Sequence, residues 1–365
     1  TNNPVNNQNV FFYANYSLTN NNQIIPYLIQ GHGDGIHAVN FVDYDNDGVQ
    51  DEYVAPFWST VRIYNIGNET PQIILPTIGY YTSDNVVVDL NNDGEDEIII
   101  IKSNYIYVYN RTGGLIWSHM FVNAHFDITV YDLNKDGFKD ILVGNSNSTV
   151  YLLNGTGNST GGIDILWENY QEGGNTNIHF LQIGDLDRDG EEDDVGIGYF
   201  SFGTNYASFV ALNETGGLIF NITKIENGMV EALEILDLNN DGYKDEIMFG
   251  NTQLYAFRYN GTINFSSTDA FLTIDTPNNI QKIVAIDIDQ DGYKDDYVLA
   301  LKDTPGGDQD MIMAFSNDSM LVTDQIWNYT DSEFNTDYND DINLLMLADI
   351  TDDGIEEMII APFIL

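Results

Sequence analysis

The chain has 365 residues, with 57 Asp or Glu and only 12 Lys or Arg, so its formal net charge is −45. This excess of negative charge makes nucleic acid and anionic lipid poor partners. The chain has no apolar run of about 18 residues, so no membrane span is expected. It also has no cysteine, which excludes disulfides and thiolate chemistry.

The first segment with a regular pattern is NVFFYANYSLTNNNQIIPYLI, residues 9–29. Two runs rich in apolar and aromatic residues flank an Asn-rich turn, which is the pattern of a β-hairpin. We therefore expect the chain to begin with two antiparallel strands.

The next segment, DYDNDGVQDE, concentrates acidic side chains at a regular spacing. Asp43, Asp45, Asp47 and Asp51 occupy positions 1, 3, 5 and 9 of a loop whose sixth residue, Gly48, allows a sharp turn. Carboxylates at these positions, together with the backbone carbonyl at position 7, can surround a hard cation. So many protein oxygens suit Ca²⁺ better than Mg²⁺, which gives up its water reluctantly. For a single copy, a solvated acidic turn is the alternative.

This acidic loop is repeated along the chain. Seven copies, named loops 1 to 7, begin at residues 43, 89, 132, 185, 237, 287 and 349, and each keeps Gly at position 6. Repetition argues against solvated turns and predicts about seven Ca²⁺ ions. Loop 7 has Thr351 at position 3, so we expect its ion to be lost most easily. The candidate ligands at positions 1, 3, 5, 7 and 9 of successive loops are Asp43, Asp45, Asp47, Val49, Asp51; Asp89, Asn91, Asp93, Glu95, Glu97; Asp132, Asn134, Asp136, Phe138, Asp140; Asp185, Asp187, Asp189, Glu191, Asp193; Asp237, Asn239, Asp241, Tyr243, Asp245; Asp287, Asp289, Asp291, Tyr293, Asp295; and Asp349, Thr351, Asp353, Ile355, Glu357.

Each loop lies within a predicted unit of four strands. Apolar runs such as DEIIIIK and DEIMFG follow the loops, and a second hairpin follows with an Asn/Gly turn, as in YIYVYNRTGGLIW, SFVALNETGGLIF and QLYAFRYNGTINF. An EF-hand would need flanking helices and a glutamate at position 12, and neither is present. The repeat predicts an all-β, single-domain chain over residues 1–365: a seven-bladed β-propeller of four-stranded antiparallel blades. Only one strand follows loop 7, so the N-terminal hairpin would complete the last blade and close the ring.

The sevenfold signature D-x-[DNT]-x-D-G-x-x-[DE] resembles the FG-GAP and VCBS repeats of integrin-α-like β-propellers, over essentially the whole chain. The Phe-Gly and Gly-Ala-Pro elements of those repeats are echoed in YVAPFW, IMFGN and IIAPF. The resemblance implies a calcium-binding β-propeller.

A second repeat consists of N-glycosylation sequons, Asn-x-Ser/Thr. Asn and Gly are good turn residues in their own right, but the recurring Ser or Thr favours glycans. Glycosylation without cysteine points to the outside of an archaeal cell or, alternatively, of a bacterial one. Seven sequons fall in the turn between the third and fourth strands of each predicted blade: Asn15, Asn68, Asn110, Asn154, Asn213, Asn260 and Asn317. The others are Asn147, Asn158, Asn221, Asn264 and Asn328.

Two further sets of residues recur at fixed positions. His37 and His179 lie six residues before a loop, and the matching positions are Ser83, Phe126, Glu231, Gln281 and Asn343. Such a ring near the channel mouth could bind a sugar or a metal, although residues of this kind more often face channel water. Trp117, Trp167 and Trp327 recur in fourth strands, where they are expected to pack between blades; quinone-binding propellers also repeat a tryptophan there.

Three classes of function fit these features. We expect a calcium-stabilised, N-glycosylated extracellular surface protein that acts as a structural or adhesive module, such as a subunit of a surface layer or filament. Its partner would be a protein or glycan at the cell surface, or further copies of itself. The alternatives are a carbohydrate-binding lectin and a polysaccharide-active enzyme, although no catalytic motif occurs. Contacts are expected on the face opposite the loops, with Tyr199, Phe202, Tyr206 and Phe334 as anchors unless these rings pack within their own loops.

Overall fold

The computed structural model describes residues 10–14, 25–29, 40–45, 47–56, 60–66, 68, 70–77, 82–123, 125–157, 162–170, 176–201, 206–223, 232–261, 264–288, 291–302, 311–316, 324–330, 342–348 and 357–362. Within these ranges the fold is all-β, and the single helix is the three-residue 3-10 helix η1 (Ser267–Asp269). No helix in the described ranges has the length and hydropathy needed to cross a membrane.

Six antiparallel sheets, named sheets I to VI, follow one another along the chain. Sheet I contains β3 (Asn40–Val42), β4 (Glu52–Pro56), β5 (Thr60–Asn65) and β6 (Ile73–Pro76). Sheet II contains β7 (Thr82–Val88), β8 (Glu97–Lys102), β9 (Tyr105–Tyr109) and β10 (Leu115–Met120). Sheet III contains β11 (His125–Tyr131), β12 (Asp140–Asn145), β13 (Thr149–Asn154) and β14 (Ile165–Tyr170).

The other three sheets keep this order with one addition. Sheet IV contains β15 (Thr176–Gly184), β16 (Asp194–Ser201), β17 (Tyr206–Leu212) and β18 (Leu218–Ile222), joined by β22 (Asn264–Phe265). Sheet V contains β19 (Ala232–Leu236), β20 (Glu246–Gly250), β21 (Gln253–Arg258) and β23 (Leu272–Asp275). Sheet VI contains β24 (Asn279–Ile286), β25 (Asp296–Lys302), β26 (Met311–Ser316) and β27 (Asp324–Thr330).

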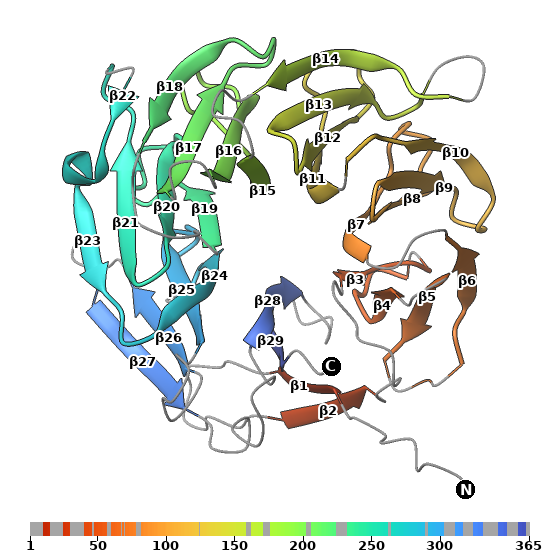
Figure 1. Ribbon diagram of the computed structural model, residues 1–365. Coiled ribbons are helices and arrows are strands. Elements are labelled where there is room, and N and C mark those ends of the chain that lie inside the picture. Colours follow the sequence, from red (N-terminus) through yellow and green to blue (C-terminus); the bar gives the residue numbers. More distant parts are fainter. Residues whose placement is uncertain are drawn as a thin grey trace, which may run out of the picture.

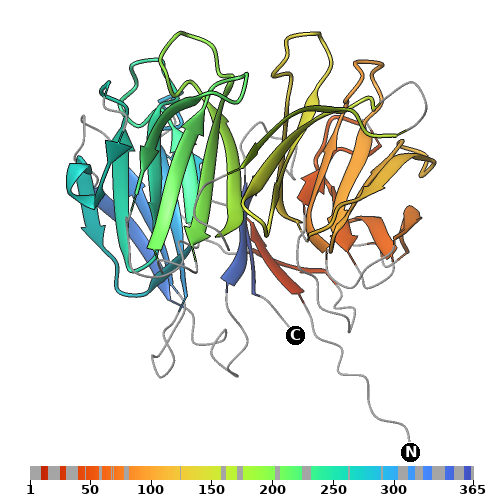
Figure 2. The same ribbon diagram turned by 45° about the horizontal axis from the view of Figure 1, so that its top comes forward.

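The sheets stand around a common centre, with the first strand of each sheet innermost and the fourth at the rim (Figure 1). The tilted view shows their strands running from one face of the molecule to the other, so that turns collect on two faces (Figure 2). Consecutive strands pair antiparallel within each sheet, as the sequence predicts.

One predicted fourth strand is wrong. The segment TINF was expected to complete sheet V, but Asn264–Phe265 forms β22 and pairs parallel with β18 of sheet IV. β23 takes the outer place in sheet V and pairs with β21. The segment between β21 and β23 is long enough to reach the neighbouring sheet, and the edge of β18 offers it unpaired backbone groups.

The two ends of the chain lie side by side. β1 (Val10–Ala14) and β2 (Ile25–Ile29) form the predicted N-terminal hairpin, and β28 (Ile342–Ala348) pairs with β29 (Glu357–Pro362). β1 runs beside β29, between sheets VI and I (Figure 1).

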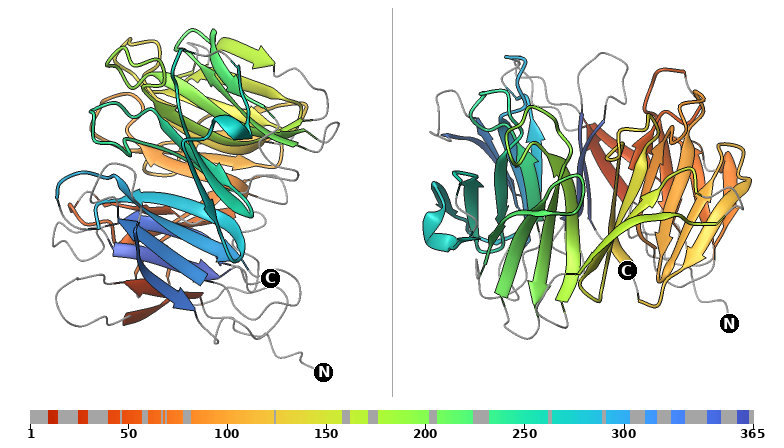
Figure 3. Two further views of the ribbon diagram at one scale, coloured as in Figure 1. Left: turned by 90° about the vertical axis from the view of Figure 1, so that its left-hand side faces the viewer. Right: turned by 90° about the horizontal axis from the view of Figure 1, so that it is seen from above.

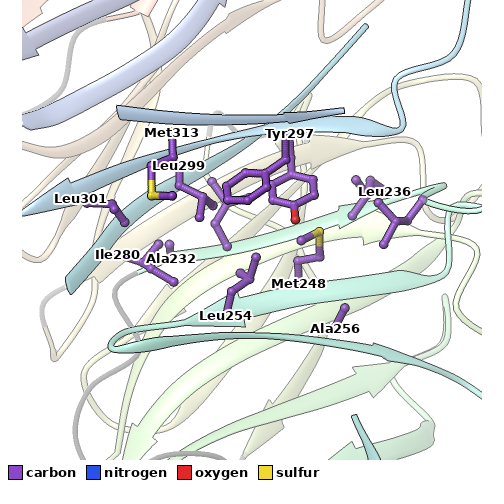
Figure 4. Packing of buried hydrophobic residues seen from close by; sticks show 13 residues of the cluster. Ala232, Leu236, Met248, Leu254, Ala256, Ile280, Tyr297, Leu299, Leu301 and Met313 are labelled. Carbon is purple, nitrogen blue, oxygen red and sulfur yellow. The ribbon is translucent and has the colours of Figure 1, made fainter. Parts of the chain in front are cut away.

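The core lies between the sheets. Second strands such as β8 and β12 are buried along their whole length, because a neighbouring sheet covers each of their faces. This explains their continuous apolar sequence. The cluster between sheets V and VI is typical: Met248 and Leu254 meet Tyr297 and Leu299 across the interface (Figure 4). Two views turned by 90° from Figure 1 show the sheets edge-on (Figure 3).

The predicted ring of polar residues coincides with a repeated backbone irregularity. Pairing of the innermost strands with their neighbours skips one residue at Ser83, Phe126, His179, Gln281 and Asn343. Each is a register shift of the kind that a β-bulge produces, and it increases the local twist of the strand. The remaining two members, His37 and Glu231, lie outside the described residues.

Candidate cation-binding loops

The first aspartate organises the backbone of every described loop. In loops 1 to 6 one of its carboxylate oxygens accepts the N–H of residue 5 and the other accepts the N–H of the glycine at position 6, at 2.8–3.2 Å. The aspartate at position 5 in turn accepts the N–H of residue 7. These bonds hold the loop closed around its carboxylates. Residues 349–356 of loop 7, together with Asp289, lie outside the described residues, and Glu357 begins β29.

Two residues in each loop adopt the left-handed conformation. The glycine at position 6 has φ between 87° and 97° in loops 1 to 6. Position 4 has φ between 55° and 64° at Asn92, Lys135, Arg188 and Asn240. Asn visits this region readily, whereas Lys and Arg do so at a cost. These left-handed residues let the chain reverse within a few positions.

The loops have two lengths, which alignment on the first aspartate conceals. Loops 2 and 3 end after eight residues, and loops 1, 4, 5 and 6 end after nine. Whatever the length, the next strand begins with a buried acid. These strand-initial acids are Glu52, Glu97, Asp140, Asp194, Glu246 and Asp296.

The strand-initial acids complete the hydrogen bonding of the loop backbone. Each accepts the N–H of the second or third loop residue, at 2.7–3.1 Å. Glu97 and Asp140 were predicted as ligands, but Glu52, Asp194, Glu246 and Asp296 were not. The sequence signal that would have revealed them is an acid directly before the apolar run of the second strand.

In loops 1 and 4 the carboxylates converge. Oxygens of Asp43, Asp45 and Asp47 lie within 4.8 Å of one another, and so do oxygens of Asp185, Asp187 and Asp194. The predicted ligand Asp193 lies outside that second group and instead pairs with Lys135 Nζ at 2.8 Å. In loop 4, therefore, Asp194 occupies the place that the alignment gave to its neighbour.

Burial makes the strand-initial acids hard to ionise. It raises the pKa of Glu52, Asp194 and Glu246 to about 7, and that of Asp140 to about 6, because charged carboxylates lose their water in the folded protein. Neighbouring acids add to the effect. A group of this kind stays ionised at neutral pH only where positive charge compensates it, and its all-oxygen donor set matches a hard divalent cation.

The sequon turns lie on the same face as the loops. Ile66, in the turn of sheet I, donates its N–H to Asp51 O at 2.8 Å, and Glu214, in the turn of sheet IV, lies close to Asp193 and Asp194. This agrees with the expected arrangement of the turns.

Hydrogen bonds within the turns account for both sequon residues. Asn213 Oδ1 accepts the Thr215 hydroxyl at 2.9 Å and the Gly217 N–H at 2.7 Å. Asn110 and Asn154 accept the matching hydroxyl at 3.0 and 2.7 Å. The conserved geometry therefore gives the Asn-x-Thr pattern a structural role. In the described part of the chain the three amide nitrogens donate no hydrogen bond, so the atom that would carry a glycan stays available.

Fourth-strand tryptophans tie neighbouring sheets together. Trp117 Nε1 donates to Gly155 O and Trp167 Nε1 to Glu214 O, each at 3.1 Å. Both acceptors are the residue after the sequon asparagine in the next sheet. The expected packing between sheets is thus observed for these two rings, and Trp327 lies in the fourth strand β27.

Polar side chains also join the innermost strands. Gln182 donates to Glu234 Oε2 at 2.9 Å and accepts the Ile235 N–H at 2.6 Å. Asp127 accepts the Leu181 N–H and is hydrogen-bonded to Asp84. These bonds satisfy backbone groups on the strand edges that border the centre.

The aromatic anchors expected on the opposite face are only partly described. Tyr199, in β16, is half-buried and packs against the cluster of sheets III and IV. Tyr206 begins β17 and is also half-buried. Phe202 and Phe334 lie outside the described residues. For Tyr199 the structure therefore favours packing within the fold.

Comparison with known proteins agrees with this architecture. The family model described as FG-GAP-like repeat matches residues 89–143, 132–194 and 237–298. A solved structure described as the Dos1 propeller is similar over 90% of this chain, and one described as BBS1N in complex with ARL6DN is similar over 90% of this chain and 93% of the BBS1N chain. Their TM-scores are 0.54 and 0.57 at 14% and 11% identity, and the Dos1 alignment covers 92% of that chain. No curated protein matches the sequence.

The sheets, their arrangement and these matches define a β-propeller. The chain is a β-propeller with FG-GAP-like repeats over residues 89–194 and 237–298.

Proposed function

We propose that this protein is a calcium-stabilised, N-glycosylated extracellular module that serves structure or adhesion, as a subunit of a surface layer or filament. The fold supports a role in interaction, since FG-GAP propellers are scaffolds and no described residues assemble a recognisable catalytic constellation. The similar BBS1N structure holds a protein partner, ARL6DN. By analogy, the partner here would be a protein, a glycan or a further copy of this chain.

A closed ring of seven blades is part of the proposal. β28, β29, β1 and β2 would form the seventh blade, and the position of β1 beside β29 supports this order. Closure would leave no inner sheet edge unpaired, which matters for a protein displayed at high density.

The observation that carries the calcium proposal is the convergence of carboxylates in closed loops that are followed by a buried acid. The aspartates at positions 1, 3 and 5 and the strand-initial acid would hold the ion, with the carbonyl at position 7 as a further ligand. In loops 1 and 4 these oxygens already lie together, and no basic side chain in the described chain is paired with the converging groups.

The test of this proposal is a calcium titration of the purified chain, read by bound metal and by melting temperature. We expect several Ca²⁺ per chain and a large rise in melting temperature, since a ligand that binds only the folded state stabilises it. D43N/D47N should lose one equivalent. A chain that holds no calcium after dialysis against a micromolar excess, and melts equally in EDTA, would refute the proposal.

Glycans on the sequon turns would cover the face that carries the loops and leave the opposite face for contacts. Mass spectrometry of the protein from its native source tests this, with Asn110, Asn154 and Asn213 as the sites expected to be occupied. Unmodified asparagine at all three would restrict the repeat to its role in the turn.

A further inference from the structure

Loop 5 differs from the other loops in its charged neighbours. We infer that loop 5 holds no metal ion, and that the guanidinium groups of Arg188 and Arg258 supply the positive charge that a cation would give it. The inference rests on the proposed calcium role of the other loops, because it concerns a loop that does not follow them.

The first argument concerns the aspartate at position 5. In loops 1 to 4 one oxygen of this aspartate accepts the N–H of residue 7, and the other has no hydrogen-bond donor among the described residues. In loop 5 both oxygens of Asp241 are engaged. Oδ1 accepts the Tyr243 N–H at 3.2 Å, and Oδ2 is paired with Arg188 Nη2, with Arg258 Nη1 at 3.9 Å. The oxygen that a metal would need is therefore occupied by a cationic side chain.

The second argument concerns the acids at the end of the loop. Asp245 Oδ2 lies 3.6 Å from Arg188 Nε, and Glu246 Oε1 lies 3.1 Å from Arg258 Nε. Both acids are fully buried. The two arginines thus contact three of the four carboxylates of the loop and its strand-initial position. A divalent cation entering the same space would meet two fixed positive charges at close range, which is strongly unfavourable.

The third argument concerns the residue that stands across the sheet from the strand-initial acid. Arg258 stands directly across the sheet from Glu246, whereas Asn65 and Asn154 stand across from Glu52 and Asp140 in sheets I and III. An uncharged amide leaves the carboxylate's negative charge in place, and a guanidinium neutralises it.

A contact with an aromatic ring holds the Arg188 side chain in place. It belongs to loop 4 at position 4, lies in the left-handed conformation with φ 64°, and places its guanidinium 4.6 Å from the centre of the Tyr243 ring. The tyrosine holds it over loop 5 by a cation–π contact.

Lys135 provides the matched comparison. It occupies position 4 of loop 3 and also reaches forward to the next loop, pairing with Asp193 and, at 3.9 Å, with Glu191. Those acids lie outside the converging group of Asp185, Asp187 and Asp194. A cation at position 4 does not by itself displace a metal; it does so where it reaches the carboxylate at position 5.

Calcium stoichiometry of loop variants of the full chain tests the inference. D237N/D241N should leave the number of bound Ca²⁺ unchanged, whereas D43N/D47N should remove one. R188Q/R258Q should bind one more Ca²⁺ than the wild type, and K135Q should bind the same number. Loss of one equivalent in D237N/D241N would overturn the inference, as would an unchanged count in R188Q/R258Q.

A metal-free measurement keeps the inference separate from the calcium proposal. In EDTA, R188Q/R258Q should melt about 2–4 °C below K135Q, because buried carboxylates in loop 5 lose the counter-charges that the two arginines supply. If the wild type bound no calcium, the proposed function would fail, and this comparison would still decide the role of the arginines. Equal melting of the two variants in EDTA would overturn it.

Discussion

At the scale of single residues, the sequon turn shows how one pattern can have two causes. The Asn-x-Thr repeat suggests glycans, yet in the turns at Asn110, Asn154 and Asn213 the threonine hydroxyl is bonded to the asparagine that precedes it by two. The turn and the glycan use different atoms of the same amide, Oδ1 and Nδ2. They are therefore compatible, and they can be separated by experiment.

In protein made without glycosylation, T215V should lower the free energy of unfolding by about 0.5–1 kcal/mol, because the exposed hydroxyl no longer bonds Asn213 Oδ1. T215S keeps the hydroxyl and should match the wild type. Urea unfolding of the three proteins measures the difference. Equal stability of T215V and the wild type would show that the turn does not depend on this bond.

A second residue-scale feature is the pair of acids at the centre of the ring. Asp84 and Asp127 are hydrogen-bonded to each other, accept the N–H groups of Asn85 and Leu181, and face the charge of Lys282. Burial raises the pKa of Asp84 to about 6 and that of Asp127 well above its ordinary value. The folded pair thus retains a proton that the unfolded chain releases at lower pH.

The sign of the pH effect follows from this retained proton. Because the folded-state pKa is raised, the pair is most favourable below about pH 4 and its contribution to stability falls as pH rises through about 6. D127N keeps an acceptor for the Leu181 N–H and donates to Asp84 without needing the proton. We expect it to be roughly 1–2 kcal/mol more stable than the wild type at pH 8 and similar at pH 4.5, by urea unfolding in saturating calcium. A constant difference across this range would contradict the shared proton.

At the scale of strands and sheets, close contact between neighbouring sheets restricts which side chains the second strands can carry. A Cβ added to Gly144 in β12 would lie 2.4 Å from Ile178 Cγ2 and 2.9 Å from its Cβ, in β15. G144A should therefore destabilise the fold by about 1–3 kcal/mol through overpacking. Adding I178A should relieve part of the strain, so the double variant should be more stable than the two single effects predict. Strict additivity in denaturant unfolding would exclude this contact.

The sequence predicts most of the strands and their order in the sheets. Apolar runs bounded by Gly and Asn locate most strands, since a strand buried on both faces needs an uninterrupted apolar sequence. The fourth strand of sheet V was misplaced because TINF has strand composition, and nothing local reveals that its partner is β18 of another sheet. Loop length was also hidden. Asp193 and Asp194 are adjacent acids at the end of loop 4, and counting from the first aspartate selects Asp193, whereas Asp194, directly before the apolar run of β16, turns toward Asp185.

At the scale of the whole molecule, the N-terminal hairpin matters more than its position in the chain suggests. β1 lies against β29, so removing residues 1–29 would expose the edge of a strand that is otherwise covered. The truncated chain should melt at lower temperature and self-associate. Light scattering and thermal melting test this. A monomeric chain of unchanged stability would argue against closure through the hairpin.

The parallel pairing of β22 with β18 also affects how the ring opens. The segment that leaves sheet V pairs with a strand of sheet IV and makes these two sheets one mechanical unit, whereas among the described residues no strand of sheet II pairs with one of sheet III. Amide protons of β17 and β21 should then exchange with solvent in a single cooperative step, and those of β9 and β13 in separate ones. A ring built from repeats would in this way unfold in unequal segments, with its most persistent part around sheets IV and V.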